Sequence, residues 1–312
     1  MLLSTQTSGL VKTLGAERAF ELLKKVGFDA VDFNMDEILP YRDVVRGNFD
    51  GNIMVCGDHV GYFTELKKII DASGVKVGQA HAPFPTYIPE NDAINERLID
   101  VMKRSIEAAA ILGTPYLVIH PRFNTSFETR LGVEEEYELN RRFYMSLADV
   151  LRGSGVTCCL ENMWTNGAWR KIYADVCGDP DDAAAMIDKL NAEAGEELFG
   201  YCYDVGHSFI SGLDPYRFML KLGKRIKVFH IHDVDGLNDS HNLPFLGVGA
   251  WRAFAKGVAA IGYDYSLSLE AGNFYNLCGK ECFPEAFALM RAVAARLKGM
   301  VEEERAALEK RS

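Results

Sequence analysis

Short apolar runs alternate with longer amphipathic segments from one end of the chain to the other. The runs have the length of strands, and the segments between them carry apolar residues at helical spacing. The eight predicted strands are, in order, Leu2–Thr7, Ala30–Met35, Val77–Pro83, Tyr116–His120, Thr157–Asn162, Phe199–Asp204, Ile226–His232 and Tyr265–Glu270. Strands that alternate with helices pair in parallel, and a run of eight such units favours closure into a (β/α)8 TIM barrel over an open sheet.

The helices between these strands have recognisable ends. Gly27 and Gly113 directly follow two of them, and Asp-Pro pairs beginning at Asp179 and Asp214 predict N-caps with proline in the first turn. The predicted helices are Glu17–Val26, Gly61–Ala72, Asn91–Leu112, Glu134–Leu151, Asp179–Ala194, Asp214–Leu222, Trp251–Ile261 and a long last helix from Pro284. Residues 36–58 show no clear pattern. No linker rich in proline, glycine or serine divides the units, so residues 1–312 are predicted as one barrel domain with a C-terminal helical extension from about residue 284.

Charge, cysteine content and the lengths of the apolar runs bear on the partners and the compartment that we expect for this protein. The formal net charge of −10 disfavours a nucleic-acid partner, because phosphate binding depends on clustered Lys and Arg. The seven cysteines are scattered and form no C-x-x-C motif, so we expect reduced thiols and a cytoplasmic protein. The N-terminus lacks the features of a signal peptide, and no apolar run approaches membrane-spanning length, so no membrane partner is expected.

Six consecutive predicted strands place side chains capable of binding a metal at the end of the barrel where active sites lie. The segment Val228–His241 is the densest, with three of the seven histidines and three aspartates in fourteen residues. The residues at these strand ends are His81, His120, Glu161, Asp204, His207, His230, His232, Asp239, His241 and Glu270. Each of them alone is more often a hydrogen-bonded structural residue than a ligand.

Their convergence favours a metal, because carboxylates and imidazoles buried together without a cation are costly. We therefore predict a divalent ion, Mn, Zn, Co or Mg, held by four of these residues. The predicted ligands are Glu161, Asp204, His230 and Glu270. His59 lies outside this pattern and is predicted as a surface or helix-cap residue.

The ordered motifs His-Ala-Pro, Ile-His-Pro, Leu-Glu-Asn, Asp-x-x-His, His-x-x-Asp, Asp-x-His and Leu-Glu resemble those of the xylose isomerase-like barrel superfamily. This group includes sugar and sugar-phosphate isomerases and epimerases, inosose dehydratase-like proteins and abasic-site endonucleases. The resemblance implies that the four predicted ligands hold one ion and that Glu161 and Glu270 exchange protons with the substrate carbon. In the endonucleases, two further zinc ions are bound at the positions that match His81, His120, His207, Asp239 and His241. In the epimerases, the position of His207 contacts the substrate.

Two positions depart from the ketohexose epimerases of the superfamily. Those enzymes have a glutamate six residues after the first glutamate, where this chain has Gly167, and an arginine six residues after the metal histidine, where it has Gly236. The departures put a ketohexose substrate in doubt.

The leading hypothesis is a divalent-metal-dependent isomerase or epimerase of a sugar, sugar phosphate or polyol, acting by proton transfer through a metal-stabilised enediolate. Trp164 and His232 are weaker candidates for lining a carbohydrate site, and Phe33, Trp169 and Trp251 also fall near predicted strand ends. The alternatives are a multi-zinc abasic-site endonuclease-like phosphodiesterase, a keto-polyol dehydratase that uses the same enediolate, and a non-catalytic barrel used as a binding subunit. A homo-oligomer is left open.

Overall fold

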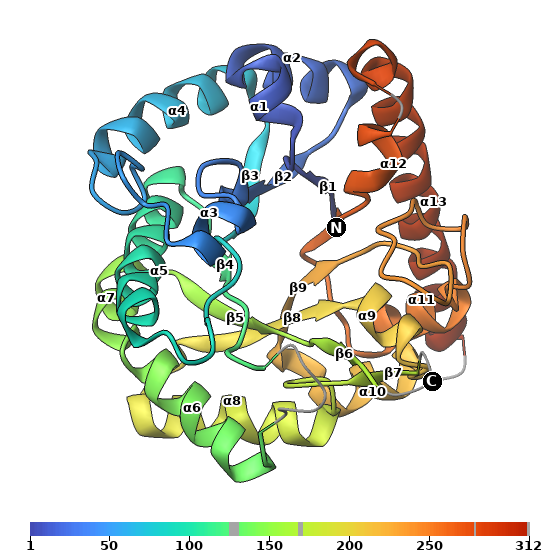
Figure 1. Ribbon diagram of the computed structural model, residues 1–312. Helices are drawn as coiled ribbons and strands as arrows, with labels where there is room; N and C mark the ends of the chain where they lie inside the picture. Colours follow the sequence, from blue (N-terminus) through green and yellow to red (C-terminus); the bar gives the residue numbers. More distant parts are fainter. Residues whose placement is uncertain (125–130, 168–170, 278, 311–312) are drawn as a thin grey trace.

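Eight parallel strands form a nearly closed barrel in the computed structural model, which describes residues 1–124, 131–167, 171–277 and 279–310 (Figure 1). The strands are β1 (Leu2–Gln6), β2 (Ala30–Asn34), β3 (Lys76–His81), β4 (Tyr116–Val118), β5 (Thr157–Glu161), β8 (Phe199–Asp204), β9 (Ile226–His230) and β10 (Ser266–Leu269). They pair in the order β10-β1-β2-β3-β4-β5-β8-β9. The seam between β9 and β10 is bridged where Ile231 N–H donates to Ser268 O and Glu270 N–H donates to Ile231 O, each at 2.9 Å. The predicted TIM barrel is confirmed.

The longer helices surround the barrel (Figure 1). They are α2 (Ala16–Val26), α4 (His59–Ser73), α5 (Asp92–Leu112), α6 (Val133–Met145), α7 (Ala148–Ser154), α8 (Pro180–Ala194), α10 (Pro215–Leu222), α11 (Trp251–Ala260) and α13 (Phe283–Glu309). The predicted caps explain several boundaries. Asp179 and Asp214 accept backbone N–H groups at the starts of α8 and α10, and Gly27 and Gly113 end α2 and α5 at positive φ.

Some predicted elements are shorter or divided. β4 ends at Val118 and β9 at His230, two residues earlier than predicted in each case, and the predicted helix over residues 134–151 is the pair α6 and α7. The elements that were not predicted are α1 (Leu10–Leu14), η1 (Met35–Glu37), α3 (Tyr41–Arg46), β6 (Trp164–Asn166), β7 (Ile172–Ala174), α9 (Val205–Ile210), η4 (Gly223–Arg225), α12 (Gly272–Asn276) and η5 (Lys280–Cys282). All of them have three to six residues, fewer than the window over which an apolar pattern of their type can be recognised.

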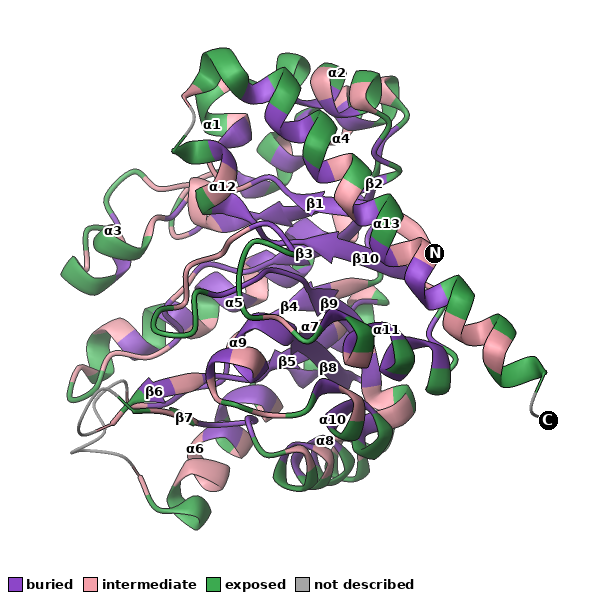
Figure 2. Ribbon diagram, turned by 90° about the vertical axis from the view of Figure 1, so that its right-hand side faces the viewer, coloured by how far each residue is buried: buried purple, intermediate pink, exposed green. Residues whose placement is uncertain are grey.

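Apolar and polar side chains occupy different parts of the barrel interior. The strands are buried and the outer faces of the helices are exposed (Figure 2). Inside the barrel a small apolar cluster of Val118, Cys159, Cys202 and Val228, with Tyr116 and Tyr265 against it, fills the space between the strands. The polar side chains lie beyond this cluster, at the carboxyl ends of the strands, where α3 and the β6–β7 hairpin also lie in Figure 2.

The helix α13 accounts for the predicted C-terminal extension. Its side chains are buried at intervals as far as Val301, and the residues after that are mostly exposed. The treatment of residues 1–312 as one domain stays a prediction. Among the described residues, no helix has the length and apolar character needed to cross a membrane. The six described cysteines are free thiols, as expected.

Candidate metal centre

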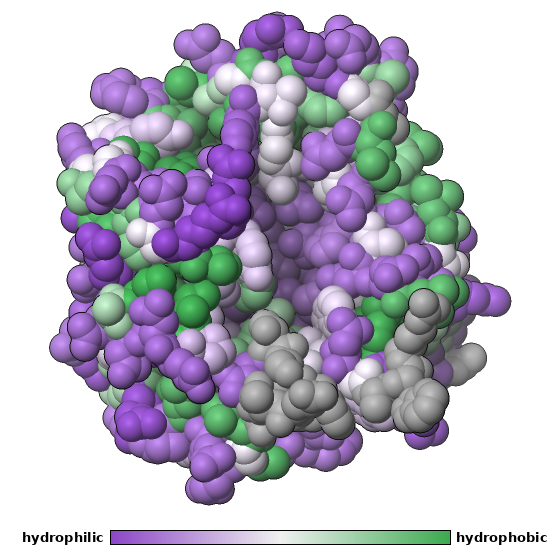
Figure 3. Space-filling model, in the orientation of Figure 1, coloured by the Kyte–Doolittle hydropathy of each residue, from purple (hydrophilic) through white to green (hydrophobic). Residues whose placement is uncertain are grey.

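A polar pocket of about 380 Å³ opens at the carboxyl ends of the strands. It corresponds to the hollow in the centre of Figure 3, where hydrophilic side chains gather. The described residues that line it are Asn34, Asp36, His81, Phe84, His120, Phe123, Glu161, Met163, Trp164, Thr165, Asn166, His207, Asp239, His241 and Glu270. Seven of these are among the residues predicted from strand ends, because the carboxyl ends of all the strands of a barrel converge on one opening.

The four predicted ligands form one group, here called the glutamate cluster (Glu161, Asp204, His230 and Glu270). Each offers a ligand atom, and these atoms lie within 4.8 Å of one another. His230 Nδ1 lies 3.2 Å from Glu161 Oε1 and 3.4 Å from Glu270 Oε2. Two ligand atoms bound at about 2.1 Å to one tetrahedral ion are about 3.4 Å apart. The spacing of the glutamate cluster therefore fits one divalent ion.

The orientation of His230 also suits a metal ligand. Its Nε2 lies 3.0 Å from Asp32 Oδ2, an oxygen that also accepts a hydrogen bond from Gln79. Since a carboxylate only accepts, Nε2 carries the proton, and Nδ1 faces the two glutamates with no hydrogen bond of its own. A carboxylate behind the ring is the usual support of a histidine ligand. Sequence reasoning missed Asp32, although a buried carboxylate in the apolar strand AVDFN was a visible signal.

The two glutamates differ in proton affinity. Burial raises the pKa of Glu270. Burial acts in the same direction on Glu161, but the charges of His230 and His120 outweigh it and hold the pKa of Glu161 well below its ordinary value. Two carboxyl groups whose environments push their pKa values apart are suited to act as the acid and the base of one proton-transfer reaction.

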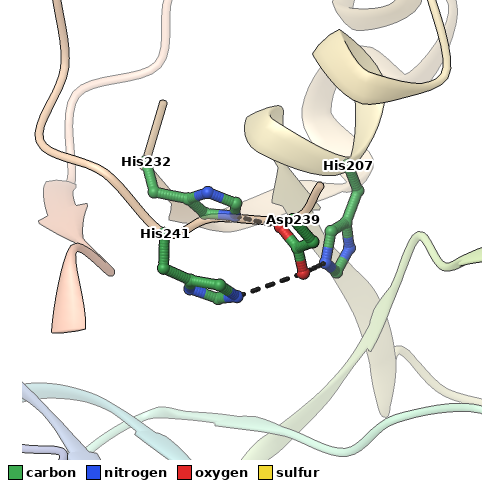
Figure 4. A group of neighbouring side chains, drawn as sticks. All are labelled: His207, His232, Asp239 and His241. Carbon is green, nitrogen blue, oxygen red and sulfur yellow. Dashed lines mark hydrogen bonds and ion pairs between the residues drawn. The ribbon is translucent and has the colours of Figure 1, made fainter. Parts of the chain in front are cut away.

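A second group lies beside the first and is called the histidine cluster (His207, His232, Asp239 and His241). Figure 4 shows the three rings converging on the Asp239 carboxylate. Asp239 Oδ2 lies 3.2 Å from Nε2 of both His207 and His241, and Oδ1 lies 3.7 Å from Nε2 of His232. Asp204 Oδ2 is 3.1 Å from His232 Nε2, so Asp204 connects the two clusters.

The rings of the histidine cluster are held from behind by backbone carbonyls. Nδ1 of His207 lies 2.7 Å from Asn162 O, and Nδ1 of His241 lies 3.0 Å from Glu270 O. Because a carbonyl only accepts, these Nδ1 atoms carry protons. If the rings are neutral, each Nε2 therefore points a lone pair at the Asp239 carboxylate. Because a lone pair and a carboxylate repel each other, this contact requires a positive charge between the imidazole and the carboxylate.

That positive charge is either a proton on each ring or a cation shared by them. Burial opposes charging His241, but Asp239 raises the pKa of its imidazole to about 10. Asp204 and Asp239 likewise raise the pKa of His207 well above its ordinary value, against the effect of burial. Imidazole and carboxylate donors of this kind suit zinc or a similar ion. The residues present therefore fit a cation here as well.

His81 and His120 form an imidazole pair next to Glu161. Their Nε2 atoms are 3.1 Å apart, and His120 Nε2 lies 2.9 Å from Glu161 Oε2. Burial lowers the pKa of His81 to about 4, so its ring is neutral at physiological pH. His81, Glu161 and His230 together make a third set of atoms close enough to share an ion.

Of the aromatic residues predicted near strand ends, one lines the pocket and two lie in the core. Trp164 lines the pocket, and its Nε1 lies 3.3 Å from Asp239 Oδ2. Phe33 packs against Phe63 in the core, and the indole of Trp251 is buried, with Nε1 donating to Asp233. Trp169 lies outside the described residues.

The prediction for His59 was wrong. The residue is buried between α4 and α5, where its Nε2 lies 2.6 Å from Glu107 and Arg104 donates to its Nδ1. The N-cap of α4 is Asp58 instead. The interhelical contact, rather than the position at the start of the helix, decides the environment of this imidazole.

Several pocket residues were not predicted. Asn34 ends β2 and Asp36 lies two residues beyond it, and Phe84, Phe123 and Met163 form an apolar part of the wall. Gly167 stands where the ketohexose epimerases have a glutamate. A Cβ added to it would meet the ring of Tyr173 at 2.2 Å. Any larger residue at this position would therefore require the Tyr173 ring to move.

Comparison with known proteins agrees with the fold. An uncharacterized protein, y4fM from Sinorhizobium fredii, is 24% identical over 93% of this chain and 91% of its own length. A probable endonuclease 4 from Mycoplasmopsis agalactiae is 28% identical, over 58% of this chain and 60% of its own.

Solved structures match over almost the whole chain. A D-tagatose 3-epimerase-like protein has a TM-score of 0.70 and 20% identity, covering 97% of this chain and 99% of its own. The IOLI protein with a binding zinc atom has a TM-score of 0.69 and 18% identity, covering 97% and 99%. The model of the family described as xylose isomerase-like TIM barrel matches residues 20–293. The chain belongs to the xylose isomerase-like TIM barrel family.

Proposed function

We propose that this protein is a divalent-metal-dependent isomerase or epimerase of a carbohydrate. The observation that carries the proposal is the pair Glu161 and Glu270, which flank His230 Nδ1 at the floor of one pocket. The epimerases among the structural neighbours support the reaction class. The bound zinc in a further neighbour supports the cofactor.

The residues of the glutamate cluster would hold the ion, which supplies Lewis-acid polarisation of a substrate carbonyl. Glu161, in its ionised form, removes the proton from the carbon next to the carbonyl. Glu270, whose carboxyl is more easily protonated, returns a proton. Return to the opposite face of the same carbon gives epimerisation, and return to the neighbouring carbon gives isomerisation. Phe84, Phe123, Met163 and Trp164 supply apolar and aromatic surface to the pocket wall.

Exchange of substrate hydrogen with deuterated water tests the roles of the two glutamates. We expect Glu161→Gln and Glu270→Gln each to reduce exchange at least about 100-fold, because each loses an acid–base group. The substrate panel comprises ketoses, sugar phosphates and inososes. Exposed Glu65→Gln, on α4, is the matched control and should exchange at the wild-type rate. Full exchange in either cluster variant removes that residue from the acid–base role, and loss of one water from the product identifies a dehydratase.

A second candidate function is a multi-zinc phosphodiesterase. The histidine cluster and the imidazole pair favour it, because they provide ligands that one sugar-binding ion does not need. The similarity to a probable endonuclease 4 favours it as well. Elemental analysis of the purified protein separates the two candidates. One ion per chain is expected for the sugar enzyme, and about three ions together with cleavage of abasic duplex DNA are expected for the nuclease.

A further inference from the structure

Asp36 is an acidic residue of the pocket that belongs to neither cluster. It lies in η1, directly after β2, and its side chain lines the pocket near the strand ends. Its Oδ1 accepts a hydrogen bond of 2.8 Å from Phe84 N–H, and its own N–H donates to Asn34 Oδ1 at 2.8 Å. These two bonds hold the carboxylate in place in the pocket wall. Its other oxygen, Oδ2, accepts no hydrogen bond from the described part of the chain.

The pocket around Asp36 is acidic. Its described lining contains four carboxylates and neither lysine nor arginine; the carboxylates are Asp36, Glu161, Asp239 and Glu270. Arg122, which follows β4, points elsewhere. Its guanidinium donates to Asn95 O at 3.1 Å and lies 4.3 Å from the centre of the Phe143 ring. The described lining thus offers an anionic substituent no lysine or arginine, and the imidazoles of His207 and His241 in it are each already paired with Asp239.

A carboxylate with a free oxygen is suited to accept hydrogen bonds from hydroxyl groups, and such charge-assisted bonds are strong. The same carboxylate repels a phosphate ester, since like charges in a partly desolvated site interact unfavourably. We infer that Asp36 is a specificity-determining residue that binds hydroxyl groups of an uncharged polyhydroxylated substrate and disfavours its phosphorylated form. This inference rests on the proposed function and narrows its substrate class.

The first test uses the wild-type protein. Burial raises the pKa of Asp36 to about 7, so the assays are run at about pH 8, where the carboxyl is largely ionised. Deuterium exchange is measured for D-ribulose, D-fructose and D-tagatose and for their terminal phosphate esters. We expect kcat/KM to be at least about 10-fold higher for a free sugar than for its ester. A preference for the ester overturns the inference and leaves the proposed function standing, whereas exchange with no carbohydrate overturns both.

The second test uses Asp36→Asn. The amide oxygen still accepts the Phe84 N–H, while an NH2 group replaces the free carboxylate oxygen. We expect KM for the free sugar to rise about 10-fold with kcat nearly unchanged, and the preference over the phosphate ester to fall by about the same factor. Asp43→Asn removes one negative charge from α3, outside the pocket, and should leave both values unchanged.

Equal KM values and an equal preference in Asp36→Asn and the wild type overturn the inference. If Asp36→Asn does not fold, the salt dependence of the wild-type protein decides. Repulsion by the pocket predicts that KM for the phosphate ester falls as ionic strength rises while KM for the free sugar stays constant. A rising KM for the ester shows attraction instead and contradicts the proposed role.

Discussion

Single carboxyl groups in this protein differ in whether burial or a neighbouring charge controls their proton affinity. Charges from two imidazoles hold Glu161 ionised, whereas burial dominates at Glu37 and raises its pKa to about 7. Glu37 Oε2 accepts the Lys12 N–H at 2.7 Å, and Oε1 is buried without a hydrogen bond. A protonated Glu37 is therefore the better fit to the folded protein.

The raised pKa of Glu37 predicts that Glu37→Gln increases the free energy of unfolding by an amount that depends on pH. The folded pKa of about 7 exceeds the ordinary 4.5, so the folded protein binds this proton more tightly than the unfolded chain does. The contribution of Glu37 to stability is then complete below pH 4.5 and is lost as the pH rises through about 7. The glutamine stays neutral, so we expect the free energy of unfolding of the variant to exceed that of the wild type by roughly 3 kcal/mol above about pH 8.

Urea denaturation at a series of pH values between about 5 and 8 measures this gain. The exposed Glu65→Gln is the control and should show no pH-dependent difference from the wild type. A constant difference for Glu37→Gln across the series would contradict the assignment of a raised pKa.

At the scale of elements, the loop between β9 and α11 is organised around one buried carboxylate. Asp233 Oδ1 accepts the N–H groups of Val234 and Gly249, and Oδ2 accepts Phe245 N–H and Trp251 Nε1–H, all at 2.9 Å. A Cβ on Gly247 would meet Asp233 Oδ1 at 2.5 Å. Asp239 and His241 are carried on this loop, so Asp233 acts on the histidine cluster as a positioning residue.

Asp233→Asn should loosen the loop. Its NH2 group would face N–H donors, so at least one backbone donor loses its acceptor, and we expect the free energy of unfolding to fall by about 1–3 kcal/mol. Amide hydrogen exchange should show faster exchange at Phe245 or Gly249. Asp235→Asn is the matched control in the same loop, because its amide oxygen can keep the acceptor role of Asp235 Oδ1 toward Leu237 and Asn238. Unchanged protection of both amides in Asp233→Asn would rule out the anchoring role.

At the scale of the whole molecule, the glutamate cluster joins four neighbouring strands. Glu161 ends β5, Asp204 ends β8, His230 ends β9 and Glu270 directly follows β10. This arc includes the β9–β10 seam, which is held by an isolated bridge between Ile231 and Leu269. An ion bound by all four residues would therefore stabilise the least continuous part of the barrel.

Metal binding should consequently raise the melting temperature. A divalent ion at 100 times its dissociation constant adds about 2.7 kcal/mol if it binds only the folded chain, which corresponds to an increase in Tm of roughly 5 °C. Scanning calorimetry with zinc, manganese, cobalt or magnesium, and with a chelator, measures the effect. His230→Ala should lose most of the increase. An equal increase in that variant would place the stabilising ion elsewhere.

The sequence determined the parts of this protein that depend on neighbours along the chain. Apolar periodicity and the caps at Asp179, Asp214, Gly27 and Gly113 act within a few residues, so the order of strands and helices could be read directly. Because parallel strands of a barrel end on one side, the polar residues after them could be expected together. The grouping of Glu161, Asp204, His230 and Glu270 in the structure follows from this rule.

Only the tertiary structure decided which side chains meet across the barrel. Asp32 supports His230 from 198 residues away, His59 is buried by α5, and Asp36 enters the pocket through its bond with Phe84. Short elements such as α9 and the β6–β7 hairpin were also unreadable, because a few residues carry too little periodicity. The physical reason is the same in each case: these contacts depend on the twist and closure of the whole sheet, which no local stretch of sequence encodes.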